Sequence, residues 1–259
     1  MKKTFVIGAG IFLICQLAFG ASVSKIYYKN GKVHYLVTME NGVRDGITKE
    51  FDENGNLIAE WNYKNGKLNG ISKQYKNGKL KYEVEYKNGV VDGITKEYYP
   101  DGRLKAKWSY VNGKKNGVST IFYKSGQVHY FSEYKDGKLN GITKEFDKNG
   151  NLTAEWRYKD GKLNGITKKY DENERVKFEV NYKNDIIDGI TKEYYPDGKL
   201  KAEWRYKDGK KNGVSVVYYP NGNKKYELTY KNGVLDGTAK EYYEDGALKA
   251  EWEYKNGKI

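Results

Sequence analysis

The chain carries a large supply of aromatic side chains that could hold a ligand, with 26 tyrosines and 5 tryptophans among 259 residues. Tryptophan and tyrosine rings stack on sugar rings and anchor extended peptides, and both are favoured at binding hot spots. A recurring Trp-x-Tyr motif brings the two types together. The candidate binding surface therefore consists of Trp61, Trp108, Trp156, Trp204, Trp252, Tyr63, Tyr110, Tyr158, Tyr206 and Tyr254.

Packing is a second interpretation of the same rings. Segments with tryptophan pair a small residue with a large one, such as Ala59 with Trp61, and the segments between them reverse the order, such as Tyr82 with Val84. Large beside small across neighbouring strands lets an apolar face interdigitate. The two interpretations overlap, because a single-layer sheet leaves part of its aromatic layer exposed, and an exposed aromatic stripe marks a partner site.

Other chemistry finds no support in the residue pattern. His34 and His129 occupy a column otherwise held by lysines, which we expect to face solvent, and they lie too far apart in the sequence array to share a metal ion. Neither histidine has the neighbours that nucleophilic catalysis needs. Paired carboxylates such as Asp52 and Glu53 fall in expected turns. We therefore predict no enzyme, no catalytic residue, no cofactor and no metal site.

Glycines at a nearly fixed pitch indicate what positions the aromatic residues. Each lies about 24 residues from the next, and the step from Gly70 to Gly93 is one residue shorter than the others. A fixed period of this length indicates a repeat array, which presents the same groups again and again rather than the dissimilar groups of a catalytic site. The nine glycines are Gly46, Gly70, Gly93, Gly117, Gly141, Gly165, Gly189, Gly213 and Gly237.

A longer period lies within this one, because the tryptophans recur at about twice the glycine spacing and so mark every second repeat. We expect one repeat domain over residues 21–259, with half a repeat at 26–45 and then nine repeats of about 24 residues that start at Gly46.

Each repeat reads as two strands and two turns. In the first tryptophan repeat, residues 47–51 form one expected strand and residues 57–63 the other. Successive side chains on a strand point to opposite faces, so we expect Leu57, Ala59, Trp61 and Tyr63 to share one face while Glu60 and Asn62 share the other. This pattern predicts an all-β, single-layer antiparallel array of about 19 strands, with one aromatic and one wet face.

Turn residues support the hairpins. Pro-Asp-Gly at 100–102 presets a turn, and Asn-Gly at 65–66 is the strongest short hairpin signal. One repeat departs from both patterns, with Glu174 and Asp185 where glycine is expected. A non-glycine residue in the left-handed region costs about 1 kcal/mol. We therefore expect the repeat that begins at Gly165 to be the least stable.

The motif Gly-x-x-x-x-Tyr-Tyr-x-x-Gly-x-Leu-x-x-Glu-x-x-Tyr-x-x-Gly-x-x-x-Gly resembles the MORN-repeat variant family of bacteria, some of whose members carry the name YwqK-type antitoxins. The resemblance covers residues 26–259. It implies hairpins laid side by side in an extended, twisted antiparallel sheet. It also implies roles in scaffolding and in binding partner proteins or membranes. No kinase motif accompanies it.

Residues 1–20 have the features of a secretory signal peptide. Lys2 and Lys3 precede an apolar run that ends in Ala-Phe-Gly at 18–20. The sole cysteine, Cys15, follows Ile14, whereas lipoprotein processing requires a small residue there. We expect export to the periplasm, the cell surface or the medium, and no helix beyond the signal segment.

Charge narrows the class of partner. The formal net charge is +13, and about +11 without Lys2 and Lys3, although lysine and glutamate alternate along the chain with no basic cluster. A basic exported protein attracts acidic partners, but export and the interleaved glutamates argue against nucleic acid. We expect an exported, non-enzymatic scaffold that binds a protein or glycan. The alternatives are an antitoxin or immunity protein, and a peripheral binder of anionic membranes. The pattern leaves the oligomeric state open.

The signal-peptide prediction is tested by the N-terminus of the native protein. We expect mass spectrometry of the exported fraction to find a chain that begins at Ala21, since the small-x-small motif ends at Gly20. Recovery of intact Met1 from a soluble cytoplasmic fraction would contradict export.

Overall fold

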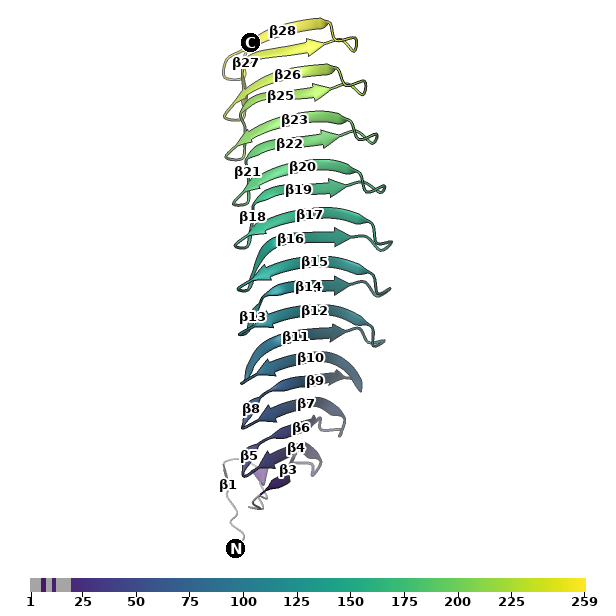
Figure 1. Cartoon of the computed structure of the whole chain (residues 1–259), viewed down its shortest axis with the longest axis vertical. Helices are drawn as coiled ribbons and strands as arrows, with labels where there is room; N and C mark the ends of the chain where they lie inside the picture. Colours follow the sequence, from purple (N-terminus) through teal and green to yellow (C-terminus); the bar gives the residue numbers. More distant parts are fainter. Residues whose placement is uncertain (1–5, 8–10, 13–19) are drawn as a thin grey trace. The chain divides into compact units, whose positions relative to one another are not determined.

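A computed structural model of the chain describes residues 6–7, 11–12 and 20–259. The expected signal peptide falls mostly outside these residues. The chain divides into two units, Met1–Gly126 and Gln127–Ile259, and each is an antiparallel sheet of hairpins (Figure 1). No helix occurs in the described residues, and so none is long and apolar enough to cross a membrane. The all-β hairpin array is confirmed.

The first unit contains fourteen strands among its described residues, and from β3 onward each strand pairs with its sequence neighbours. They are β1 (Val6–Ile7), β2 (Ile11–Phe12), β3 (Ala21–Tyr27), β4 (Val33–Glu40), β5 (Val43–Arg44), β6 (Gly46–Phe51), β7 (Leu57–Lys64), β8 (Lys67–Leu68), β9 (Gly70–Lys76), β10 (Lys79–Lys87), β11 (Val90–Tyr98), β12 (Leu104–Val111), β13 (Lys114–Lys115) and β14 (Gly117–Phe122).

The second unit repeats the same pattern with fourteen more strands. They are β15 (Val128–Lys135), β16 (Lys138–Phe146), β17 (Leu152–Lys159), β18 (Lys162–Leu163), β19 (Gly165–Tyr170), β20 (Val176–Lys183), β21 (Ile186–Ile187), β22 (Gly189–Tyr194), β23 (Leu200–Lys207), β24 (Lys210–Lys211), β25 (Gly213–Tyr218), β26 (Lys224–Lys231), β27 (Val234–Tyr242) and β28 (Leu248–Tyr254). Across residues 20–259, twenty strands are six residues or longer, against about 19 expected.

The additional long strand precedes the segment that the sequence suggested was half a repeat. Strand β3 pairs with β4 along its whole length, with Ser24 opposite Val37. Ser24 is buried and lies one repeat period before Thr48, in the same column of the repeat. The chain before Gly46 therefore contains a hairpin, with Ser22 at the position that glycine occupies in later repeats.

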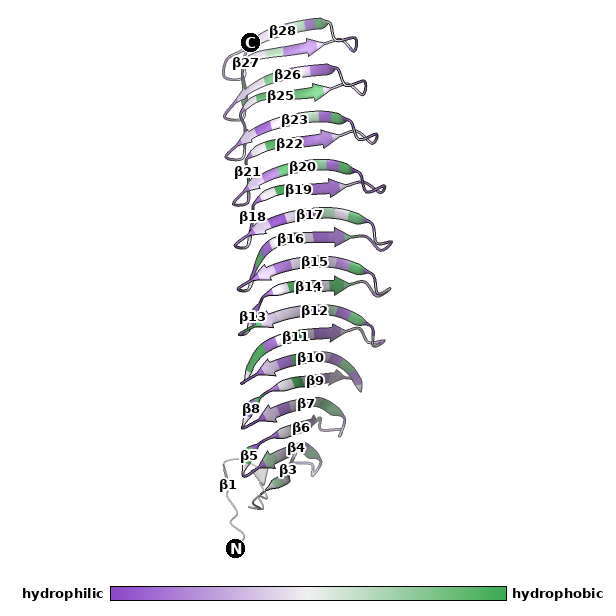
Figure 2. Cartoon of the chain, viewed as in Figure 1, coloured by the Kyte–Doolittle hydropathy of each residue, from purple (hydrophilic) through white to green (hydrophobic). Residues whose placement is uncertain are grey.

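The register places two distinct sets of side chains on the two faces of each hairpin. On one face, Thr48 lies opposite Trp61 and Glu50 opposite Ala59, and we call this face, with the equivalent residues of other repeats, the tryptophan face. On the other face Lys49 lies opposite Glu60, and we call it the ion-pair face. Figure 2 shows apolar and polar residues mixed along the strands, as expected when both faces of a sheet must be covered by its own side chains.

The most buried residues are small and lie on the tryptophan face. Thr48 is 1% exposed, Ala59 3%, Ser72 1% and Ala106 1%. The large rings of the same face are half-buried rather than buried. Since the strands of each unit contact strands next to them in sequence, the small residues are covered mainly by large side chains of their own face. Stability is then a sum of nearest-neighbour terms.

The turns follow the sequence signals. Asn65 and Gly66 both have positive φ, 47° and 76°, as a two-residue type I′ turn requires. The longer turn at Tyr99–Arg103 is closed by Tyr99 N–H donating to the Arg103 carbonyl, and Gly102, at φ 86°, follows the Pro100 corner. In the shorter repeat that begins at Gly70, this longer turn is replaced by Asn77-Gly78, again with positive φ at both residues. The missing residue is therefore lost from a turn.

The two exceptional turn residues are left-handed, as expected, with φ 57° at Glu174 and 70° at Asp185. However, each side chain also forms a bond to the preceding repeat. Glu174 accepts a hydrogen bond from Leu152 N–H at 2.8 Å, and Asp185 accepts one from Leu163 N–H at 2.7 Å. These bonds offset part of the backbone strain.

We predict that Glu174→Gly combined with Asp185→Gly changes the free energy of unfolding by less than about 1 kcal/mol in total. Relief of strain favours the variant by roughly 1 kcal/mol per site, while loss of each hydrogen bond costs about as much. Urea unfolding of the double variant and of each single variant measures this balance. A gain in the double variant equal to the full strain relief of both sites would show that the two bonds contribute nothing.

Candidate partner-binding surface

The five tryptophans lie on the tryptophan face, each opposite a small residue of its own hairpin. Trp108 faces Thr95, Trp156 faces Thr143 and Trp204 faces Thr191. On the other side of each threonine lies the smaller residue of a non-tryptophan repeat, such as Val84 beside Thr95. Each threonine therefore lies between one large and one smaller side chain. The alternation of the two repeat types along the sequence thus places large and smaller side chains alternately across the sheet.

Polar tips of the rings are held by a glutamate between them. Trp61 Nε1 donates to Glu50 Oε2 at 2.8 Å, and the Tyr35 hydroxyl donates to Glu50 Oε1 at 2.9 Å. Burial, followed by the hydrogen bond to Glu50, raises the pKa of the Tyr35 hydroxyl to about 12. The two rings approach the carboxylate from opposite sides, so it orients both of them.

This glutamate recurs with the tryptophan period. The equivalent tyrosine hydroxyls donate from Tyr82 to Glu97 and from Tyr130 to Glu145. The column comprises Glu50, Glu97, Glu145, Glu193 and Glu241. We did not predict this column from the sequence, although its spacing equals that of the tryptophans.

A basic side chain from a β-bulge lies beside each of these carboxylates. The register shifts where Lys105 is the extra residue of β12, and its Nζ donates to Glu97 Oε1 at 3.0 Å. Lys201 contacts Glu193 in the same way at 2.7 Å. The bond to Glu97 raises the pKa of the Lys105 ammonium group. The bulge thus directs Lys105 toward the tryptophan face, although simple alternation would assign this residue to the opposite face.

The histidines belong to the same bulge column, which corrects the expectation that it merely faces solvent. His34 Nε2 lies 3.8 Å from Glu50 Oε1, and its ring stacks on Tyr28 with centroids 4.1 Å apart. His129 lies 3.9 Å from Glu145 in the other unit. Across the described residues, no group of three or more His, Cys, Asp or Glu side chains is arranged to hold a metal ion.

A second row of rings runs along the two-residue turns. Tyr63 lies opposite Leu68, and Tyr158 lies opposite Leu163. Two repeats substitute a lysine for the leucine: Lys211 Nζ lies 3.7 Å from the Trp204 ring centroid, and Lys115 Nζ lies 5.6 Å from that of Trp108. Burial lowers the pKa of both ammonium groups. These lysines therefore cover tryptophan rings and stabilise them through cation–π contacts.

All ten predicted site residues are half-buried. A recess of about 350 Å³ opens between Trp61, Tyr63 and Glu50. The structure therefore brings the candidate rings of each unit onto one face, as expected. It also uses the same rings to cover the small residues beneath them.

The ion-pair face contains specific contacts between charged and aromatic side chains. Lys96 Nζ and the Tyr98 hydroxyl both contact Glu83, at 3.2 and 2.7 Å. Burial alone would raise the pKa of Glu83, but these two hydrogen bonds outweigh it and lower the pKa. Between such pairs lie exposed aliphatic residues, among them Ile71 and Ile166.

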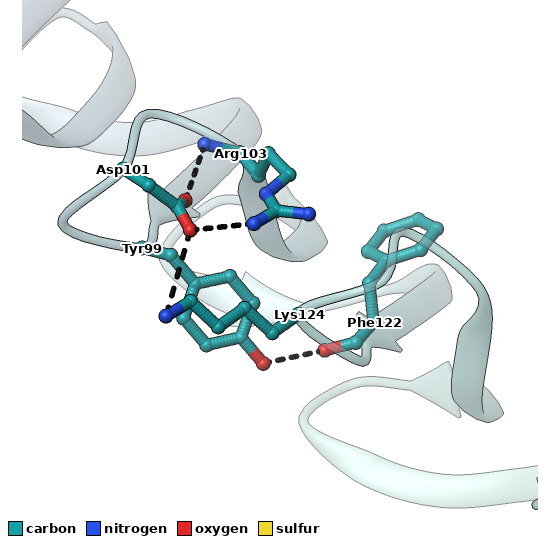
Figure 3. A network of polar contacts seen from close by, with 5 residues as sticks. All are labelled: Tyr99, Asp101, Arg103, Phe122 and Lys124. Atoms are coloured by element: carbon teal, nitrogen blue, oxygen red, sulfur yellow. Dashed lines mark hydrogen bonds and ion pairs between the residues drawn. The ribbon is translucent and has the colours of Figure 1, made fainter. Parts of the chain in front are cut away.

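The longer turns of neighbouring hairpins are joined by polar bonds. The Tyr99 hydroxyl donates to the Phe122 carbonyl at 2.8 Å, and Asp101 forms ion pairs with Arg103 and with Lys124 (Figure 3). Tyr195 repeats the first contact, donating to the carbonyl of Tyr218. The bonded turns form a row along one side of each unit (Figure 1), and rings such as Tyr99 and Tyr195 are fixed by their own hydroxyls.

Comparison with protein families agrees with this geometry. The sequence profile of the MORN repeat variant family matches residues 23–41, 44–65, 68–88, 91–112, 139–160, 163–184, 187–208, 211–232 and 235–256. The chain belongs to the MORN repeat variant family. The MORN matches begin before the first glycine of the array, as the hairpin β3–β4 does.

Other comparisons add little to the MORN assignment. No curated protein matches the sequence. A virginiamycin B lyase from Staphylococcus aureus aligns with 98% of this chain and 84% of its own length, at 13% identity and a TM-score of 0.18. A structure described as TcdB2-TccC3-Cdc42 aligns with 87% of this chain and 16% of its own, at 12% identity and a TM-score of 0.21. Similarity this low supports no inference about the MORN chain.

We predict that Trp108→Ala and Trp156→Ala each destabilise their unit by about 2–3 kcal/mol. This is less than the roughly 3–5 kcal/mol lost with a fully buried aromatic ring, because both rings are half-buried. Urea unfolding followed by the remaining tryptophan fluorescence measures the change. Ile166→Ala, on the exposed part of the ion-pair face, is the control and should cost less than about 0.5 kcal/mol. Unchanged midpoints for both tryptophan variants would exclude a packing role.

Proposed function

We propose that this MORN-repeat chain is an exported, non-enzymatic scaffold whose tryptophan face binds a protein or glycan partner. The observation that supports it is the half-buried state of all ten candidate rings. Each ring keeps an accessible surface while contacts with its neighbours fix its orientation. Aromatic rings that are ordered before binding lose little conformational entropy when a partner docks.

The absence of an enzymatic role is part of the proposal. The polar groups of the tryptophan face include a glutamate and a basic residue that recur with the tryptophan period, and in several repeats a tyrosine or tryptophan donates to the glutamate. At Glu50, for example, the carboxylate accepts hydrogen bonds from both Tyr35 and Trp61. Carboxylates held in this way contribute to the stability of the face itself, which supports a scaffold rather than a catalytic role.

The decisive experiment captures partners with the chain beginning at Ala21. Bait proteins are wild type, a tryptophan-face variant with Tyr110→Ser and Tyr158→Ser, and a control with Ile71→Ser and Ile166→Ser on the ion-pair face. Envelope and medium extracts are applied to each bait, with unfolding curves recorded for all three. We expect a partner that is retained by wild type and control and is lost from the tryptophan-face variant.

The same experiment separates the alternative functions. Capture of a toxin whose activity the chain neutralises would instead identify an antitoxin or immunity protein. Retention of anionic vesicles, equal in all three baits and abolished by salt, would indicate peripheral membrane binding through net charge. Loss of the partner from the control but not from the tryptophan-face variant would assign binding to the ion-pair face and contradict the proposal.

A further inference from the structure

The row of longer turns is interrupted in the first unit. The turn at Asn77–Gly78 is the shortened one, and it precedes the turn that contains Tyr99 and Pro100. Turns elsewhere donate to the next turn, as Asn30 does to the Glu53 carbonyl and Lys32 to the Asn54 carbonyl. In the described part of this unit, no such side-chain bond leads from Asn77–Gly78 to the turn at Tyr99–Arg103.

A hollow of about 470 Å³ lies at this interruption. Its apolar part includes Tyr99 and Pro100, and the Tyr99 ring is held in place by the bond from its hydroxyl to Phe122. Four lysines line the hollow, namely Lys76, Lys79, Lys81 and Lys105. The hollow therefore combines flat apolar walls with a concentration of positive charge, and its volume lies in the range of small-ligand pockets.

Most of that charge is not neutralised within the hollow. Lys105 is paired with Glu97, the carboxylate that also lines the hollow. Lys81 lies over the Tyr82 ring, with its Nζ 4.8 Å from the centroid. Lys76 and Lys79 are exposed at the rim, and neither forms an ion pair in the described structure of this unit.

The second unit contains the equivalent hollow and serves as an internal comparison. It measures about 520 Å³ and has Tyr195, Pro196, Lys177 and Lys201 at the corresponding positions. Where the first unit has Lys76 and Asn77, the second has Asp171 and Glu172. The apolar walls are thus shared by both units, while the surplus of positive charge is confined to the first.

We propose that the Tyr99 hollow is a binding site for an acidic saccharide, with a sugar ring against Tyr99 and Pro100 and its carboxylate or sulfate among the lysines. The apolar C–H face of a sugar packs on an aromatic ring, and the lysines supply charge without requiring one fixed geometry. A membrane is a less suitable ligand because these groups line a recess. A lipid headgroup would have to move out of the bilayer surface to reach them. This inference rests on the proposed binding function and narrows it to one ligand class.

Calorimetric titration of the chain beginning at Ala21 with defined oligosaccharides tests the proposal. The probes are tetragalacturonate, its methyl ester as an uncharged match, and a heparin-derived tetrasaccharide. We expect at least one acidic probe to bind with an affinity that falls as salt rises, and the methyl ester to bind at least about tenfold more weakly. Failure of both acidic probes to bind would overturn the proposal.

Two pairs of matched variants locate the site. Lys76→Glu with Lys79→Glu should weaken binding by about tenfold or more, whereas Lys67→Glu with Lys87→Glu, which alters net charge equally outside the hollow, should weaken it less than about threefold. Tyr99→Leu should weaken binding, and Tyr195→Leu, the same change in the second unit, should leave it unaltered. Unfolding curves confirm that each variant remains folded.

Three results would overturn the assignment. Equal weakening by the two lysine pairs would show that net charge, not the hollow, attracts the saccharide. Equal effects of the two tyrosine variants would remove the ring from the site. Lys76-dependent binding of phosphatidylglycerol vesicles without saccharide binding would assign the lysines to a membrane. Since the titration uses purified components, its failure is distinguishable from failure of partner capture by the tryptophan face.

Discussion

The structure depends on one constraint: each unit is a sheet that must cover its residues with its own side chains. Within a unit the strands contact strands close to them in sequence. The residues that become almost inaccessible are therefore small, such as Thr48 and Ala59, and the rings above them remain half-exposed. A core of this kind has no separate interior. The side chains that stabilise the fold are also the side chains that a partner meets.

The alternation of repeat types follows from this constraint. A tryptophan covers the threonine opposite it, and a tyrosine of the neighbouring repeat approaches the same glutamate from the other side, as Trp61 and Tyr35 do at Glu50. Alanine at position 59 leaves room for these rings. If every repeat carried both a tryptophan and the large tyrosine, adjacent rings would compete for one space, and overpacking is itself destabilising. The spacing of the tryptophans thus reflects packing: two successive hairpins, one with tryptophan and one without, together form one repeating unit of the packed face.

Much of this architecture could be predicted from the sequence, because repeats, strand alternation and Asn-Gly turns are local signals. Alternation assigned Ala59, Trp61 and Tyr63 to one face correctly, but it was wrong for Leu57, which pairs with Phe51 beyond a register shift. It failed at the bulges, where one extra residue per strand directs Lys105 and His34 to the glutamates of the tryptophan face. Local reasoning also predicted the left-handed conformations of Glu174 and Asp185. It could not predict their bonds to leucines of the preceding repeat, which depend on how hairpins stack.

Collisional quenching of tryptophan fluorescence tests most directly whether the aromatic face is both core and surface. Acrylamide is the suitable quencher because it is uncharged and the face is rich in lysine. We expect emission at shorter wavelength than that of free tryptophan in water, and a quenching constant between those of free and fully buried indole, since all five rings are half-buried. Quenching equal to that of free tryptophan would mean that the rings do not pack. Negligible quenching would mean that another surface already covers the face, and either result would show that these rings are not both core and surface.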